Sequence, residues 1–78
     1  TLELPKDVMY GDSIVTITGR REVLIENYKG ILEYTGEYIK IQTKNAKLTV
    51  YGKKLSIEYY TNEDMKVVGF VKSIEYEA

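Results

Sequence analysis

The sequence predicts an all-β fold, in which short antiparallel strands form a meander of hairpins that curls into a small roll or barrel. Three observations predict it. Apolar and polar residues alternate through most of the chain, as they do when a sheet buries one face and exposes the other. Turn-forming residues interrupt this alternation at regular intervals. No stretch keeps its apolar residues at helical spacing for three turns.

Four glycines, Gly19, Gly36, Gly52 and Gly69, recur at intervals of 17, 16 and 17 residues and organise the predicted strands. An apolar strand precedes each glycine and another follows it. The preceding strands include residues 14–17, 31–34, 48–50 and 67–68, and the following strands include 23–25, 39–41, 55–57 and 71–74. A repeat this short fits either an antiparallel meander or a short β-solenoid with one coil per unit. Residues 43–47 and 60–64 resemble hairpin turns, which favours the meander and leaves the solenoid as the alternative.

The alternation also predicts which side chains form the core. One residue of every two along each strand should face inward. The expected core residues are Val15, Ile17, Val23, Ile25, Leu32, Ile39, Ile41, Leu48, Val50, Leu55, Ile57, Val68, Phe70 and Ile74.

A chain of 78 residues has room for a single domain over residues 1–78, with an extended segment over residues 1–8 that leads into the first strand. A domain of this size has a thin core. It contains neither Cys nor His, so disulfides and the usual zinc sites cannot reinforce it, and self-association is the expected source of extra stability. The chain starts at Thr1 without a methionine, as a piece of a longer protein would.

The sequence lacks the groups that most enzymes use. Without His and Cys there is no catalytic triad, thiol nucleophile or imidazole base, and no glycine-rich nucleotide loop occurs. The acidic pairs Glu63–Asp64 and Glu75 with Glu77 are expected to be solvated charges rather than catalytic or metal-binding groups. We therefore predict a protein that is not an enzyme, with no cofactor, no metal and no small-molecule substrate.

The charges also bear on partners and location. Eleven basic residues against twelve acidic ones leave no basic excess for nucleic acid. The longest apolar runs are too short for a membrane-spanning helix or a signal peptide. The charge balance therefore predicts no nucleic-acid partner, and the absence of Cys fits a cytoplasmic protein. The basic pairs Arg20–Arg21, Lys53–Lys54 and Lys44 with Lys47 fall in predicted turns, where solvated charge is the usual interpretation.

Eight tyrosines, one phenylalanine and no tryptophan give the chain an unusual aromatic content. The alternation points Tyr38, Tyr51 and Tyr60 away from the core. Exposed tyrosines are common in protein interfaces, although cross-strand tyrosine pairs would equally stabilise the sheet alone. The last strand also leaves Val71 on a poorly protected edge. We therefore assign these four residues to an interaction surface and predict a homodimer formed through an edge or a sheet face.

Several segments, in order, resemble the YabP/YqfC family of sporulation proteins, and the YqfC branch most. They are residues 2–8 (LELPKDV), 15–19 (VTITG), 25–34 (IENYKGILEY), 39–43 (IKIQT), 52–57 (GKKLSI) and 69–76 (GFVKSIEY). The segment 9–13 lacks the proline expected there. The resemblance implies a role in endospore formation in the mother cell, and a membrane-protein partner encoded nearby, which would hold the protein at the periphery of a membrane. It implies no catalytic residues.

Two functions of different classes follow. The first is a non-catalytic sporulation module that dimerises and docks on a protein partner. The alternative is a small ligand- or anion-binding β domain at the cell envelope, which predicts that Lys44, Lys53 and Lys54 converge at one end of the roll.

Overall fold

The computed structural model describes residues 11–77, which form six strands and no helix. The predicted segment over residues 1–8 lies outside this range. The strands are β1 (Ile14–Thr18), β2 (Glu22–Glu26), β3 (Gly30–Tyr34), β4 (Tyr38–Gln42), β5 (Lys47–Tyr60) and β6 (Asp64–Glu77). All neighbouring strands are antiparallel, in the order β1-β2-β6-β5-β4-β3. The predicted all-β antiparallel class is confirmed, and the solenoid alternative, which needs parallel stacking, is wrong.

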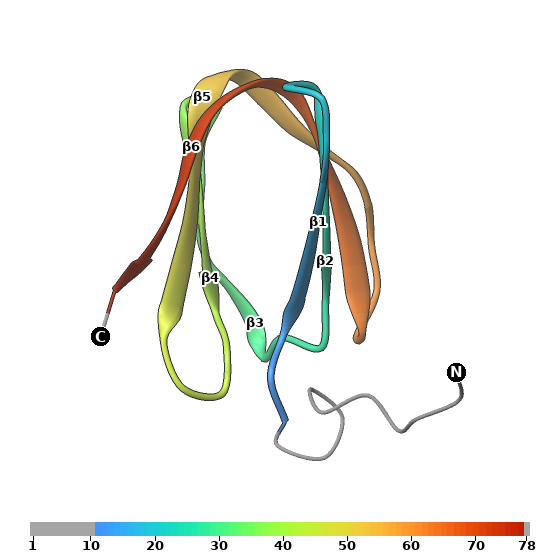
Figure 1. Cartoon of the computed structure of the whole chain (residues 1–78), viewed down its shortest axis with the longest axis vertical. Coiled ribbons are helices and arrows are strands. Elements are labelled where there is room, and N and C mark those ends of the chain that lie inside the picture. Colours follow the sequence, from blue (N-terminus) through green and yellow to red (C-terminus); the bar gives the residue numbers. More distant parts are fainter. Residues whose placement is uncertain (1–10, 78) are drawn as a thin grey trace.

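The sheet is folded over on itself because β5 and β6 are long and bend in the middle (Figure 1). The first half of β5 and the second half of β6 continue into β4 and β3 and form one layer. The second half of β5 and the first half of β6 continue into β2 and β1 and form the other. The result is a two-layered roll, bent at one end and open at the other.

The glycine repeat marks the bent end. Gly19 and Gly36 lie in the turns of the β1–β2 and β3–β4 hairpins, where the chain reverses and stays in its layer. Gly52 and Gly69 lie inside β5 and β6, where the strand crosses into the other layer. The repeat is thus a real structural unit of strand, glycine and strand, but its last two copies are continuous bent strands instead of hairpins.

Hydrogen bonds tie the two hairpin turns to the two bends. The amides of Gly69 and Val71 in β6 donate to the carbonyls of Arg21 and Arg20, at 3.2 and 2.7 Å. In the same way Gly52 of β5 donates to Glu37, at 2.9 Å, and Leu55 of β5 donates to the β3–β4 turn. Two amide groups at each bend are therefore satisfied by carbonyls of the neighbouring turn, as buried backbone requires.

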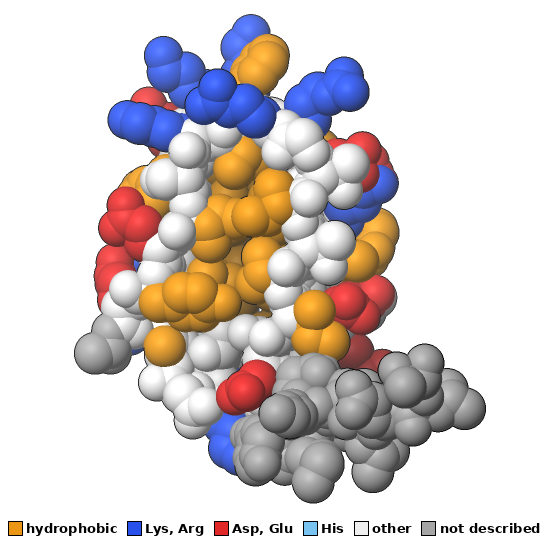
Figure 2. Space-filling view, in the orientation of Figure 1, with side chains coloured by type: hydrophobic (Ala, Val, Ile, Leu, Met, Phe, Trp, Pro, Cys, Tyr) orange, Lys and Arg blue, Asp and Glu red, His pale blue; other side chains and the backbone are white. Residues whose placement is uncertain are grey.

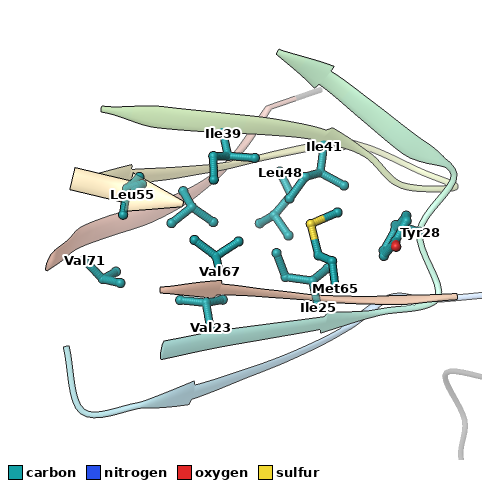
Figure 3. Packing of buried hydrophobic residues seen from close by; sticks show 11 residues of the cluster. Val23, Ile25, Tyr28, Ile39, Ile41, Leu48, Leu55, Met65, Val67 and Val71 are labelled. Atoms are coloured by element: carbon teal, nitrogen blue, oxygen red, sulfur yellow. The ribbon is translucent and has the colours of Figure 1, made fainter. Parts of the chain in front are cut away.

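The core lies between the two layers (Figure 3). Side chains of β2 and of the first half of β6 point toward those of β4 and of the first half of β5. The buried apolar residues are Val23, Ile25, Tyr28, Ile39, Ile41, Leu48, Val50, Leu55, Met65, Val67 and Val71.

The core prediction is confirmed for seven residues, namely Val23, Ile25, Ile39, Ile41, Leu48, Val50 and Leu55. Val15, Ile57 and Ile74 pack against the core but are only partly buried.

Four core predictions need correction. In β6 the inward residues are Val67 and Val71, so Val68 is only partly buried and Phe70 is 63% exposed. Leu32 is exposed because a bulge between Ile31 and Glu33 interrupts the alternation of β3. Ile17 faces inward with Val23 but stays 55% exposed, because no described residue covers that end of β1.

Candidate functional site

The two sides of the roll, where the edges of its layers face each other, differ. On one side, β3 lies opposite the second half of β5. The amide of Ile57 donates to the Tyr34 hydroxyl across the gap at 3.0 Å. The Tyr28 ring stacks on the Tyr60 ring, with the ring centres 5.8 Å apart and the planes inclined by 13°. Aromatic side chains thus close this side.

The other side lies between β1 and the second half of β6, and it remains open. Both segments are edges of the described sheet, so their outer backbone groups have no ladder partner there. Ile17 of β1 and Tyr76 of β6 face inward by their pairing with Val23 and Leu48, yet they are 55% and 62% exposed. Apolar side chains are visible between the two backbones in Figure 2. This exposed apolar strip, flanked by two unpaired strand edges, is what strand addition by another chain requires.

Among the edges, β1 has the least protection against pairing. Its sequence, IVTIT, has no charge and no proline, and its register with β2 is regular over all five residues. By contrast, β3 contains a bulge, and the second half of β5 has register shifts on both sides of Ser56. The second half of β6 carries Lys72, Glu75 and Glu77. Charges and bulges are the usual means by which proteins block edge pairing, and β1 has neither.

The predicted surface residues do not form one surface. Tyr38 and Tyr51 are directly paired across β4 and β5 and are half-buried, with their ring centres 6.4 Å apart. The Tyr38 hydroxyl donates to the Glu33 carboxylate at 2.7 Å. This hydrogen bond and the negative charge of Glu33 raise the pKa of Tyr38. Cross-strand tyrosine pairing, the alternative to an interface role in the sequence analysis, is therefore present. The pair stabilises the outer face of one layer.

Tyr60 and Val71 lie elsewhere. Tyr60 pairs with Met65, which places its ring on the inward side of β5, stacked on Tyr28 and half exposed. Val71 is only 9% exposed and belongs to the core. The expectation that Val71 presents its side chain at an edge is wrong, because Val71 keeps the inward phase of Met65 and Val67. The phase changes only beyond Val71, where the register with β5 shifts between Tyr51 and Gly52. The edge position of β1 was not predicted from the sequence. Residues 14–18 contain no charged side chain, and this absence indicates a strand whose edge is unprotected.

The acidic pairs of the sequence do not form a candidate catalytic or metal-binding site among the described residues. Glu63 lies in the β5–β6 turn and Asp64 begins β6, and their amides donate to the Thr61 hydroxyl at 3.1 and 2.9 Å. Glu77 is 3.9 Å from Lys40. Within residues 11–77, no group of three or more acidic side chains could hold a metal ion. Nor does this part of the chain contain a helix long and apolar enough to cross a membrane.

The three lysines of the anion-binding alternative do not converge. Lys53 and Lys54 lie at the bend of β5, whereas Lys44 lies in the β4–β5 turn at the opposite end of the roll (Figure 1). The prediction that these three lysines converge at one end of the roll is therefore wrong.

Tyr28 gives the closed side a measurable pH dependence. Its hydroxyl donates to the carbonyl of Thr61, and burial, followed by the nearby Tyr60 and Asp64, raises the pKa of Tyr28 to about 12. Its ordinary value is 10.0. Below pH 10 both the folded and unfolded chains keep this proton. Between pH 10 and about 12 only the folded chain does, so the free energy of unfolding falls as pH rises.

We therefore expect Tyr28 to contribute up to about 2 to 3 kcal/mol to the alkaline loss of stability. Urea unfolding of wild type and Tyr28→Phe, measured between pH 8 and pH 12, checks this. The Phe variant should be less stable at pH 8, because the hydrogen bond to Thr61 is gone, and the difference should shrink as pH rises. A constant difference would show that Tyr28 ionises normally.

Comparison with known proteins gives a consistent result. The pattern that defines the YabP family matches residues 10–78. The chain is also similar to a protein of Bacillus subtilis (strain 168), whose name is "Uncharacterized protein YqfC". The two are 28% identical over 75 residues, covering 96% of this chain and 81% of that protein. No solved structure matches.

Proposed function

The chain belongs to the YabP family, and from this premise we propose that it is a non-catalytic assembly module of endospore formation that forms a homodimer by pairing its β1 strands. The observation that carries this proposal is the uncharged and regular edge of β1 on the open side of the roll, which no strand among residues 11–77 pairs with. Sporulation as the process is supported by the family resemblance alone.

A second copy is a good occupant because β1 is complementary to itself. In antiparallel pairing about Thr16, Thr16 meets its own copy, Val15 meets Ile17, and Ile14 meets Thr18. Val15 and Ile17 both face the inside of the roll, so the apolar strip would continue from one copy into the next. No charge opposes a like charge in this register, and β-branched pairs of this kind stabilise sheets. The pairing would also extend the layer that contains β1 from four strands to eight, which would reinforce a domain with a thin core.

Sedimentation equilibrium over a hundredfold concentration range tests the dimer. Wild type should dimerise, and Thr16→Lys should be monomeric, since two lysines would meet at the symmetry axis. Thr16 is exposed, so the fold should survive. Ser56→Lys, a matched control on an exposed position of the irregular β5 edge, should still dimerise. A monomeric wild type at all concentrations would contradict the proposal.

The same variants test the cellular role. In its spore-forming host, loss of this gene should lower the yield of heat-resistant spores. A Thr16→Lys allele should reproduce that loss, while a Ser56→Lys allele should restore the yield. Full spore yield from the Thr16→Lys allele would show that the protein's function does not depend on pairing through β1.

A further inference from the structure

The bent end of the roll carries a concentration of positive charge. Arg20 and Arg21 of the β1–β2 turn, Lys53 and Lys54 of the β5 bend, and Lys72 of β6 are all exposed there. We call these five residues, with Phe70, the basic tip. Figure 2 shows Lys and Arg side chains gathered around this end.

Specific contacts hold the segments of the basic tip together. The carbonyl of Arg20 accepts from the amide of Val71 at 2.7 Å, and Lys53 is the ladder partner of Phe70. These contacts join three segments that are far apart in the sequence, so the cluster is a product of the fold.

The cations of the tip make no ion pair within the part of the chain that the structure describes. Among residues 11–77, the ion pairs involve Lys40 and Lys66 and none of the five tip residues. Glu22, the acidic residue beside Arg21, is 3.1 Å from Lys66. Glu37 is the acidic residue of the nearby β3–β4 turn. In the rest of the chain, six basic residues are outnumbered by twelve acidic ones. The charge asymmetry would orient the molecule tip first toward a negative surface.

An apolar side chain projects from the middle of these charges. Phe70 is 63% exposed, the highest value among the large apolar residues described. It separates two shallow hollows. One of about 280 Å³ is lined by Arg20, Lys53 and Lys72, and the other, of about 460 Å³, is lined by Arg21 and Glu22. Both hollows are open to solvent, so they suit groups presented by a surface better than an enclosed small molecule.

We propose that the basic tip binds the surface of a membrane that contains anionic phospholipids. Lipid phosphates would sit among the arginines and lysines, and the Phe70 ring would enter the boundary between headgroups and acyl chains. Clustered cations with an adjacent aromatic residue are the chemistry that such surfaces bind. A nucleic acid fits less well, because one ring offers no platform on which successive bases could stack.

Co-sedimentation with vesicles tests the proposal. The probes are phosphatidylcholine vesicles with and without 30% phosphatidylglycerol (about a third of the lipid, enough for a strong negative surface potential). Wild type should bind only the anionic vesicles, and Lys53→Gln with Lys72→Gln should weaken binding by about 25-fold, at about fivefold per charge. Phe70→Ser should weaken it as well, since the apolar contribution is lost.

The matched control removes two charges from the other end of the roll. Lys29 lies in the β2–β3 turn and Lys47 at the start of β5, and both are exposed. Lys29→Gln with Lys47→Gln changes the net charge equally and should leave binding within about twofold of wild type, because these charges lie beyond one Debye length from the surface. Equal losses in the two double variants, full binding by Phe70→Ser, or no binding by wild type would each overturn the proposal.

The vesicle assay does not depend on the β1 dimer. Pairing β1 strands antiparallel points the two tips of a dimer in opposite directions, so each tip would meet a membrane alone. Thr16→Glu should be monomeric for the same reason as Thr16→Lys, since two like charges would meet at the symmetry axis. It keeps its tip and should retain vesicle binding.

Discussion

Replacing Gly69 with alanine is expected to lower the free energy of unfolding by about 3 kcal/mol or more. Gly69 has a φ of +137°, which side chains rarely adopt, and an added Cβ would lie 2.5 Å from the carbonyl oxygen of Lys54. Gly52→Ala should have a similar effect, since its Cβ would overlap the carbonyl oxygen of Phe70. Both clashes are with backbone atoms, at the bends where β5 and β6 pass from one layer into the other. Neither clash can be relieved by rotating a side chain.

Urea unfolding of Gly69→Ala, Gly52→Ala and Gly36→Ala checks this. Gly36 is the control, because it belongs to the same repeat but has no atom within 4 Å of an added Cβ. A loss of this size would be a large fraction of the total for a small domain, which is of order 5 to 15 kcal/mol. If the three variants lost equal stability, the bends would not be the reason for Gly52 and Gly69.

The second large effect concerns which side chains of β6 face the core. Met65 is fully buried, and Met65→Ala should cost about 2 to 5 kcal/mol, because it removes apolar contacts and leaves a cavity between the layers. Phe70 is mostly exposed, and Phe70→Ala should cost less than about 0.5 kcal/mol, as surface substitutions do.

The same unfolding measurement decides this prediction. The core predicted from sequence alone includes Phe70 and omits Met65, so it gives the opposite order of effects. A larger loss for Phe70→Ala would place that ring in the core and would contradict both the described burial and the basic tip.

The sequence predicts this fold well where strands are regular. In β2, β4 and the first half of β5, period-two alternation identifies the buried residues, including Val23, Ile25, Ile39 and Ile41. Alternation fails in residues 67–71 because four of the five are apolar, so either phase fits the pattern. Only the pairing of β6 with β2, a tertiary feature that sets Val67 opposite the buried Val23, decides which phase faces inward. Leu32 is a similar case, since its exposure follows from a bulge that residue types do not reveal.

The candidate site was less predictable than the fold. The sequence predicts an interaction surface that includes Tyr38, Tyr51 and Tyr60. In the structure Tyr60 stacks on Tyr28 at the closed side of the roll, and Tyr38 pairs with Tyr51. These are contacts between segments far apart in the chain or paired across strands, which sequence spacing cannot distinguish from partner contacts. The edge position of β1 depends on strand order, and the pairing of β2 with β6 that sets this order is the least local in the sheet.

The homodimer through β1 is the central claim, and charge reversal at its symmetry axis tests it most directly. Thr16→Lys and Thr16→Glu should each sediment as monomers. Mixed in equal amounts, they should form a heterodimer, because lysine then opposes glutamate across the paired strands. Recovery of the dimer only in the mixture is the result that β1 pairing predicts. A mixture that stays monomeric while wild type dimerises would show that the dimer forms through another surface.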